Sequence, residues 1–186
     1  MYEYTGRDHR VPSNVTHVQI HSSVTKIGKS AFEDRAELRE VVFNEGLKRI
    51  ENSAFYHCKS LQSITIPSTV MEIGSNAFSR CENLREVVLN NGLREIGYTA
   101  FANCKTLQII TIPSTVTKIG NYAFIGSNLR EIVLNEGLTE IGCRAFPGTA
   151  LQEIAIPSTV IEIGRNAFGS CIRLNEVVLN EGLFRD

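Results

Sequence analysis

Apolar residues recur along this chain at equivalent places that are 22 or 23 residues apart. The first apolar position of each of the eight copies is occupied by valine or leucine, at Val15, Leu38, Leu61, Leu84, Leu107, Leu129, Leu151 and Leu174. The third and fifth residues after it are also apolar, as Ile64 and Ile66 illustrate. This period of two predicts a short strand with one buried face. Strands one repeat apart in a winding chain stack side by side, so the pattern predicts a solenoid built on a parallel sheet.

The second half of each copy contains Ile-Gly-x-x-Ala-Phe, or a close variant of it, and this motif predicts a short helical turn. The phenylalanines of the seven complete copies are Phe32, Phe55, Phe78, Phe101, Phe124, Phe146 and Phe168. Six or seven buried apolar side chains per copy contribute about 10 to 20 kcal/mol. Ordering one copy costs about 1 to 2 kcal/mol for each of its residues. A single copy is therefore unstable alone and must share its faces with its neighbours.

Two kinds of turn alternate after the predicted strands, which makes the true repeat about twice as long. Odd-numbered copies from the third onward carry Ile-Pro-Ser-Thr-Val, with prolines at Pro67, Pro113 and Pro157. Even-numbered copies carry Asn-x-Gly-Leu, with asparagines at Asn44, Asn90, Asn135 and Asn180. Proline lacks a backbone donor and fits where a strand stops pairing. Asparagine tolerates the backbone of a tight turn, so we expect these side chains to cap their own turns.

The motif L-x-x-I-x-I-P-S-T-V-x-x-I-G-x-x-A-F-x-x-C resembles the BspA-like leucine-rich repeats over residues 15–186. The resemblance implies an α/β repeat solenoid, that is, a leucine-rich-repeat superhelix with a concave parallel β-sheet and short helical turns or an irregular convex side. It also implies protein binding or adhesion, and it transfers no catalytic residue. The predicted organisation is an N-terminal capping segment at residues 1–14 and a repeat domain at residues 15–186, with seven full repeats and a truncated eighth.

Charge and hydropathy narrow the classes of partner. The chain has 19 basic and 20 acidic residues and a net charge of −1, so nothing favours nucleic acid as a partner. No apolar run reaches the 18 residues typical of a membrane span, and the first ten residues are polar where a secretory signal is hydrophobic. From the sequence as written we expect a cytoplasmic protein that does not insert into membranes.

Catalytic chemistry has no support in the sequence. The four histidines, His9, His17, His21 and His57, lack partners at metal-binding or triad spacing, and no nucleotide or hydrolase motif is present. Cys58, Cys81, Cys104 and Cys171 share one position of the repeat, which predicts a row of small, buried, reduced side chains. Cys143 lies at a position that favours exposure. We therefore expect no enzyme activity, no cofactor and no metal.

The predicted concave face is the candidate binding surface, because repeat solenoids use this face for partners. Its outward positions form a row rich in glutamate and, beside it, an apolar strip. The residues predicted to bind a protein or peptide are Glu40, Val42, Glu86, Val88, Thr111, Glu131, Val133, Glu153 and Glu176. The competing interpretation is a solvated face propagated by the copying of repeats. The predicted function is a protein-interaction scaffold, and the alternative is a structural or adhesive segment of a larger cell-surface repeat protein.

The final copy stops at Asp186, before its Ile-Gly and Ala-Phe positions, and would leave the seventh copy half covered. Three explanations remain open. The chain is a piece of a longer array, it associates end to end with a second copy, or Phe184 closes the last layer.

Overall fold

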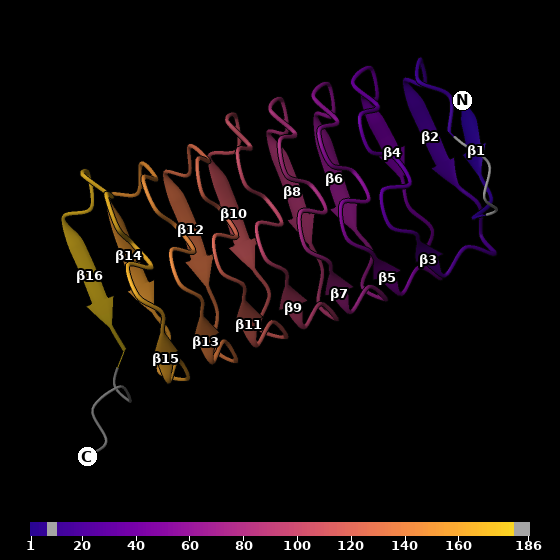
Figure 1. The fold of residues 1–186 in the computed structure, drawn as a ribbon. Coiled ribbons are helices and arrows are strands. Elements are labelled where there is room, and N and C mark those ends of the chain that lie inside the picture. Colours follow the sequence, from indigo (N-terminus) through magenta and orange to yellow (C-terminus); the bar gives the residue numbers. More distant parts are fainter. Residues whose placement is uncertain (7–10, 181–186) are drawn as a thin grey trace.

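The computed structural model describes residues 1–6 and 11–180, so His9, Phe184 and the end of the eighth copy lie outside the described residues. The described chain is a parallel β-solenoid in which each repeat forms one rung (Figure 1). The strands follow one another along the axis in sequence order, with β1 (Tyr2–Tyr4) and β16 (Glu176–Leu179) at opposite ends. Tyr2–Tyr4 pairs in parallel with the first strand of the repeats, and Tyr4 and Val11 are buried.

Each repeat contributes one longer strand, as its period of two predicted. These strands are β2 (His17–Ile20), β4 (Glu40–Val42), β6 (Ser63–Ile66), β8 (Glu86–Leu89), β10 (Ile109–Ile112), β12 (Glu131–Leu134), β14 (Glu153–Ile156) and β16. Exposed and buried residues alternate along most of them, for example along β6. Equivalent positions of neighbouring rungs meet in register, as Ile64 and Val87 do, so the predicted parallel stacking is confirmed.

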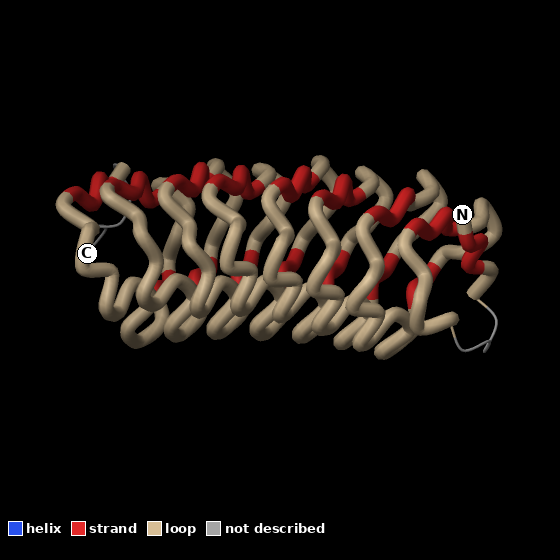
Figure 2. Tube along the Cα trace, turned by 90° about the horizontal axis from the view of Figure 1, so that it is seen from above, coloured by secondary structure: helices blue, strands red, loops and turns tan. Residues whose placement is uncertain are grey.

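A second parallel sheet, which the sequence analysis did not predict, runs along the solenoid beside the first (Figure 2). Its two-residue strands are β3 (Lys26–Ile27), β5 (Arg49–Ile50), β7 (Glu72–Ile73), β9 (Glu95–Ile96), β11 (Lys118–Ile119), β13 (Glu140–Ile141) and β15 (Glu162–Ile163). Each places a charged residue next to an isoleucine, and the isoleucine is buried in all rungs except the last. The chain therefore turns inward through a hydrogen-bonded strand and not through an isolated apolar contact.

The predicted α/β class and its helical turns are wrong, because the described residues contain strands and turns but no helix. An α-helix requires negative φ and a bond from each N–H to the carbonyl four residues earlier. Here Ala31 donates to Gly28 at 3.2 Å within its own rung, whereas Phe32 donates to Ala54 of the next rung at 2.7 Å. Twelve non-glycine residues of these segments, such as Ser30, have φ between 49° and 62°. Backbone hydrogen bonds within one rung alternate with hydrogen bonds to the next rung, so these segments are successive turns and not helices.

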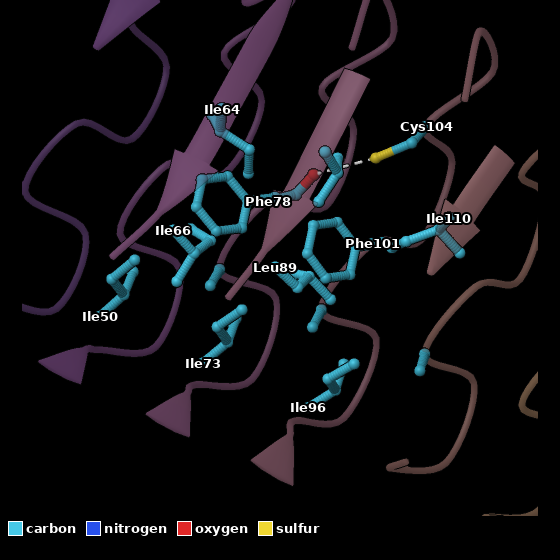
Figure 3. Packing of buried hydrophobic residues seen from close by; sticks show 14 of the residues in the cluster. Ile50, Ile64, Ile66, Ile73, Phe78, Leu89, Ile96, Phe101, Cys104 and Ile110 are labelled. Atoms are coloured by element: carbon cyan, nitrogen blue, oxygen red, sulfur yellow. Dashed lines mark hydrogen bonds between the residues drawn. The ribbon is translucent and has the colours of Figure 1, made fainter. Parts of the chain in front are cut away.

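The core is a continuous column of stacked side chains between the two sheets (Figure 3). Neighbouring rings from Phe32 to Phe168 lie 4.8 to 5.5 Å apart, with interplanar angles of at most 8°. Tyr4 of β1 contacts the ring of Phe32 at 4.9 Å, so an aromatic ring covers the N-terminal end of the column. Stacking of identical side chains explains why the motif keeps its phase: a shifted rung would place Phe against a smaller residue.

The doubled repeat is visible in how the longer strands pair. Pairing is continuous within the pairs β6–β8, β10–β12 and β14–β16, but β8 and β10 are not paired, nor are β12 and β14. Between β4 and β6 only Glu40 and Ser63 pair. Each weak junction precedes a strand that is followed directly by proline, which has no N–H to donate to the previous rung. At the last rung, where asparagine takes this place, Asn180 donates to the Ile156 carbonyl at 3.1 Å.

The asparagines also bond the preceding rung. Asn44 accepts from the Gly46 N–H at 2.6 Å in its own turn, as expected, but its amide donates to the carbonyls of His21 and Val24. Asn135 donates to the Ile112 carbonyl at 2.9 Å. The prediction that these side chains cap their own turns therefore holds at Asn44 but misses their role between rungs.

Candidate functional site

The outward residues of the longer strands form a surface that we call the long-strand face. Its first row contains glutamate in five rungs, at Glu40, Glu86, Glu131, Glu153 and Glu176, and all five side chains are exposed. The second row is the apolar strip of Val42, Thr65, Val88, Thr111, Val133, Ala155 and Val178, and these residues are also exposed. Every residue predicted for binding therefore lies on this one face.

A hollow with a volume of about 700 Å³ lies at the C-terminal end of the long-strand face, over β12, β14 and β16. Val133, Ala155 and Val178 line it from three successive rungs, and Ala155 has the smallest side chain of the strip. The hollow lies over the junction where β12 and β14 are not paired. At that junction even Leu134, an inward-facing residue, is only half-buried.

Three glutamates, Glu131, Glu153 and Glu176, also line this hollow. Glu153 and Glu176 occupy paired positions of neighbouring strands. None of the three has a cationic side chain within 4 Å among residues 1–6 and 11–180, whereas Glu40 lies 3.8 Å from His17. Like charges one rung apart, about 4.8 Å, repel by roughly 1 kcal/mol in water. Arg130 also lines the hollow, so three carboxylates and one guanidinium give it a net negative charge above an apolar floor.

Metal-ligating side chains do not cluster in the part of the chain that the structure describes. It contains no group of three or more His, Cys, Asp or Glu side chains placed to hold a metal ion. His57 Nδ1 lies 2.6 Å from an Asp34 carboxylate oxygen, and His21 Nδ1 lies 2.7 Å from the Ser23 hydroxyl, and each pair links neighbouring parts of the surface. Residues 1–6 and 11–180 include no helix that is long and apolar enough to cross a membrane.

The cysteine row is structural. Cys58, Cys81 and Cys104 are fully buried free thiols, and each Sγ donates to a phenylalanine carbonyl of the previous rung at 3.1 to 3.3 Å. Burial raises the pKa of Cys58 and of Cys104 to about 12, and it raises the pKa of Cys81 well above its ordinary value. Since the thiolate is the reactive form, these thiols are poor nucleophiles.

Cys143 is partly exposed, in keeping with its predicted position, but Cys171 is partly exposed as well. The prediction of a uniformly buried row therefore fails at Cys171, which lies in the seventh and last complete copy, where Phe168 is also only partly buried.

A second depression, which the sequence analysis did not identify, lies beside the short strands. We call it the trough. It has a volume of about 250 Å³, and its walls include Glu72, Glu95, Tyr98, Asn52 and Asn121. Tyr98 is 49% exposed, and its ring lies 5.8 Å from the ring of Tyr122, edge to face. The sequence does contain a signal for this site, because Tyr98 and Tyr122 depart from the repeat: no other rung has an aromatic residue at either of these two positions.

Comparison with known proteins identifies the same repeat. A family model described as "BspA type Leucine rich repeat region (6 copies)" matches residues 11–128 and 94–185. A crystal structure of a leucine-rich cell surface protein from Faecalibacterium prausnitzii is 31% identical, with a TM-score of 0.77, over 95% of this chain and 49% of that chain. A leucine-rich repeat protein of T. pallidum is 25% identical, with a TM-score of 0.76, over 86% of this chain and 78% of that one.

A leucine-rich repeat protein from Bacteroides ovatus shares the fold at 22% identity, with a TM-score of 0.68, over 98% of this chain and 65% of that chain. The chain thus spans about half of the F. prausnitzii protein and about two thirds of the B. ovatus protein. No curated protein gives a significant match.

Proposed function

Because the chain belongs to the BspA-type leucine-rich repeat family, we propose that it is a non-enzymatic scaffold that binds an extended segment of a partner protein on its long-strand face. The observation that carries this proposal is the hollow over β12, β14 and β16, where the apolar strip meets the unpaired glutamates. Apolar surface supplies the free energy of association, and uncompensated charge supplies selectivity and orientation.

The exposure of the apolar strip supports this proposal. Val42, Val88 and Val133 each leave 37 to 39% of their surface in contact with water, although they lie on regular strands in the middle of the molecule. Ile109 replaces the glutamate of the first row in the fifth rung and is 55% exposed. A continuous exposed apolar strip with a charged border is typical of an interaction surface.

The charge of the hollow indicates the kind of segment that fits it. Glu131, Glu153 and Glu176 face a ligand that lies along the solenoid axis, one carboxylate per rung. Lysine or arginine side chains on the partner would remove the repulsion between these carboxylates. Apolar side chains between the cations would cover Val133 and Val178. The partner segment is therefore basic and amphipathic.

The test is a pull-down of partners from the native source with the wild-type chain and the Glu131→Lys/Glu153→Lys/Glu176→Lys variant. We expect the variant to lose the specific partners. The matched control is Glu37→Lys/Glu45→Lys/Glu162→Lys, which changes the net charge equally at exposed positions outside the long-strand face. The control should keep the partners. Retention of every specific partner by the first variant, with unchanged salt dependence, contradicts the proposed binding face.

A second candidate is a structural or adhesive segment of a larger cell-surface repeat protein. It is supported by the F. prausnitzii relative, which is described as a cell surface protein. The C-terminal end of the stack also supports it, because Ile163 of the seventh copy and Val177 and Leu179 of the eighth are 40 to 48% exposed where their equivalents inside the stack are buried. A further rung, or a second copy packed end to end, would cover them. The mass of the natural gene product discriminates: additional repeats favour this candidate, and a product of 186 residues favours the free scaffold.

A further inference from the structure

We infer that the trough beside the short strands is a binding site for a neutral saccharide, separate from the long-strand face. Its position is defined by Tyr98, an exposed tyrosine that lines the trough. Glu72 and Glu95 on β7 and β9 also line it, each two residues before the glycine of its rung. The site lies along the row of short strands from β7 to β13 in Figure 1.

The floor of the trough is a consequence of stacking and does not by itself indicate a ligand. Gly74, Gly97 and Gly120 line it, and an added Cβ at each would lie 2.6 to 2.7 Å from an atom of the preceding rung. Glycine recurs at this place in every complete copy except the second, which has Glu51. The lining also includes Tyr98, whose ring the stacking of rungs does not require, because other rungs have Ser75 or Asn121 at this position.

The tyrosines provide the apolar surface that a sugar ring requires. At the position of Tyr98 other rungs have residues such as Ser75 and Asn121, and at the position of Tyr122 they have Ser, Asn, Thr or, in the sixth copy, Arg144. Tyr122 has φ of 58°, a backbone conformation that costs a bulky residue roughly 1 to 2 kcal/mol. The Arg144 guanidinium lies 5.9 Å from the Tyr122 ring. Tyr122 packs edge to face against Tyr98, and Arg144 lies against Tyr122, so the three side chains form one cluster beside the trough.

The trough presents complementary hydrogen-bonding groups. The Oδ1 atoms of Asn52 and Asn121 accept the N–H groups of Ser75 and Cys143 at 2.9 and 2.7 Å. Each amide therefore keeps its NH₂ group as a donor, and neither NH₂ group donates to a described residue. The carboxylates that line the trough are acceptors. Hydroxyl groups both donate and accept, so a polyhydroxylated ring can use both kinds of group at once.

The charge balance favours a neutral ligand over a cation. Glu72 pairs with Arg49 at 3.4 Å, and Glu140 pairs with Lys118 at 2.9 Å. Within the described ranges Glu95 is the carboxylate of the trough that has no ion pair within 4 Å. One uncompensated charge among amide donors suits a hydroxylated ligand, because a cation would leave the donors unused. The trough spans three rung spacings, about 14 Å, so an extended oligosaccharide can follow the axis.

The experiment is a titration of the isotope-labelled chain, followed by NMR amide shifts, with cellotriose and with maltotriose. We expect one of these neutral trisaccharides to move the amide signals of Ser75, Tyr98 and Asn121, with the weak affinity typical of a shallow site. Tyr98→Ser restores the residue type of the preceding rung and should weaken binding about five- to tenfold. Glu95→Gln, which keeps the shape of the side chain, should also weaken it.

The matched control is Tyr56→Ser, which removes a partly exposed tyrosine outside the trough and should leave the affinity unchanged. Spermidine, a linear polyamine, serves as the cationic probe. The inference is overturned if neither trisaccharide moves the trough signals, if Tyr98→Ser binds like the wild type, or if only spermidine binds there. None of these outcomes bears on the pull-down with the long-strand face.

Discussion

Replacement of Gly97 by alanine tests whether close backbone stacking holds the rungs together. A Cβ at this position would lie 2.7 Å from the Gly74 carbonyl carbon, 2.7 Å from the Ile73 oxygen and 2.9 Å from the Ser75 nitrogen. All three are backbone atoms, so no side chain can rotate away. The two rungs must separate locally, and the bond from the Gly97 N–H to the Ile73 oxygen, now 2.8 Å, must lengthen.

The expected loss follows from these contacts. Insertion of a methyl group into a well-packed region costs about 1 to 3 kcal/mol, and a lost hydrogen bond costs about 1 kcal/mol. Together they predict a decrease of about 2 to 4 kcal/mol in the free energy of unfolding. The control is Gly28→Ala, the same change in the first repeat, where nothing lies within 4 Å of the added Cβ. Because φ of Gly28 lies outside the left-handed region, alanine fits there without strain. The free energy of unfolding should then rise by up to about 1 kcal/mol, since alanine restricts the unfolded chain.

Urea unfolding followed by circular dichroism measures both variants, and the midpoints are compared at equal denaturant dependence. A Gly97→Ala midpoint within error of the wild type would refute the reasoning, because a clash with three backbone atoms would then have no cost. Equal destabilisation by Gly28→Ala would also refute it, since the loss would arise from the glycine itself and not from the neighbouring rung.

Two further predictions concern the core. Phe101→Ala should lower the free energy of unfolding by about 3 to 5 kcal/mol. Phe168→Ala should lower it by less, because Phe101 stacks on two rings and the partly buried Phe168 stacks on Phe146 alone. The midpoints of urea unfolding measure both losses, and equal losses would contradict the stacking argument. Burial raises the thiol pKa values of Cys58, Cys81 and Cys104 above their ordinary value of 9.0, to about 12 for Cys58 and Cys104. The protonated thiols therefore stabilise the folded chain fully below pH 9, and this contribution declines toward pH 12. The decline should be about 1.4 kcal/mol per pH unit for each thiol, and the triple alanine variant should show a shallower fall; parallel pH profiles of the two proteins would contradict this.

The sequence predicted the stacked strands because residues such as Ile64 and Ile66 alternate with exposed positions in every copy. It did not predict the second sheet, because a strand of two residues, such as Glu72–Ile73, is too short to show a period. It mistook the Ala-Phe segment for a helical turn for a related reason. The N–H groups of that segment bond both their own rung and the next one, and bonds to the next rung depend on the whole stack rather than on local sequence.

The candidate surfaces were predictable to different degrees. Alternation placed Glu131, Glu153 and Glu176 on one face, but it could not predict the hollow, which depends on the weak junction between β12 and β14. The trough was missed because Tyr98 and Asn121 come from positions after the Ile-Gly motif, where the backbone conformation was not known. Without that conformation, Tyr98 was one polar-aromatic residue among several exposed ones.

The place at which a ligand binds along a solenoid can be defined only by residues that depart from the repeat. A side chain that recurs in every rung offers a ligand the same contact at each step of about 4.8 Å, so such contacts add affinity but permit sliding. Ala155 in the hollow and Tyr98 in the trough each break a row at one rung. Replacing Ala155 with threonine, the residue of the equivalent rungs at Thr65 and Thr111, should therefore narrow the hollow and shift or weaken binding without disturbing the exposed strip elsewhere. If instead both surfaces bind equally well after the departures are removed, recognition depends on the repeated residues, and each ligand must occupy several registers along the axis.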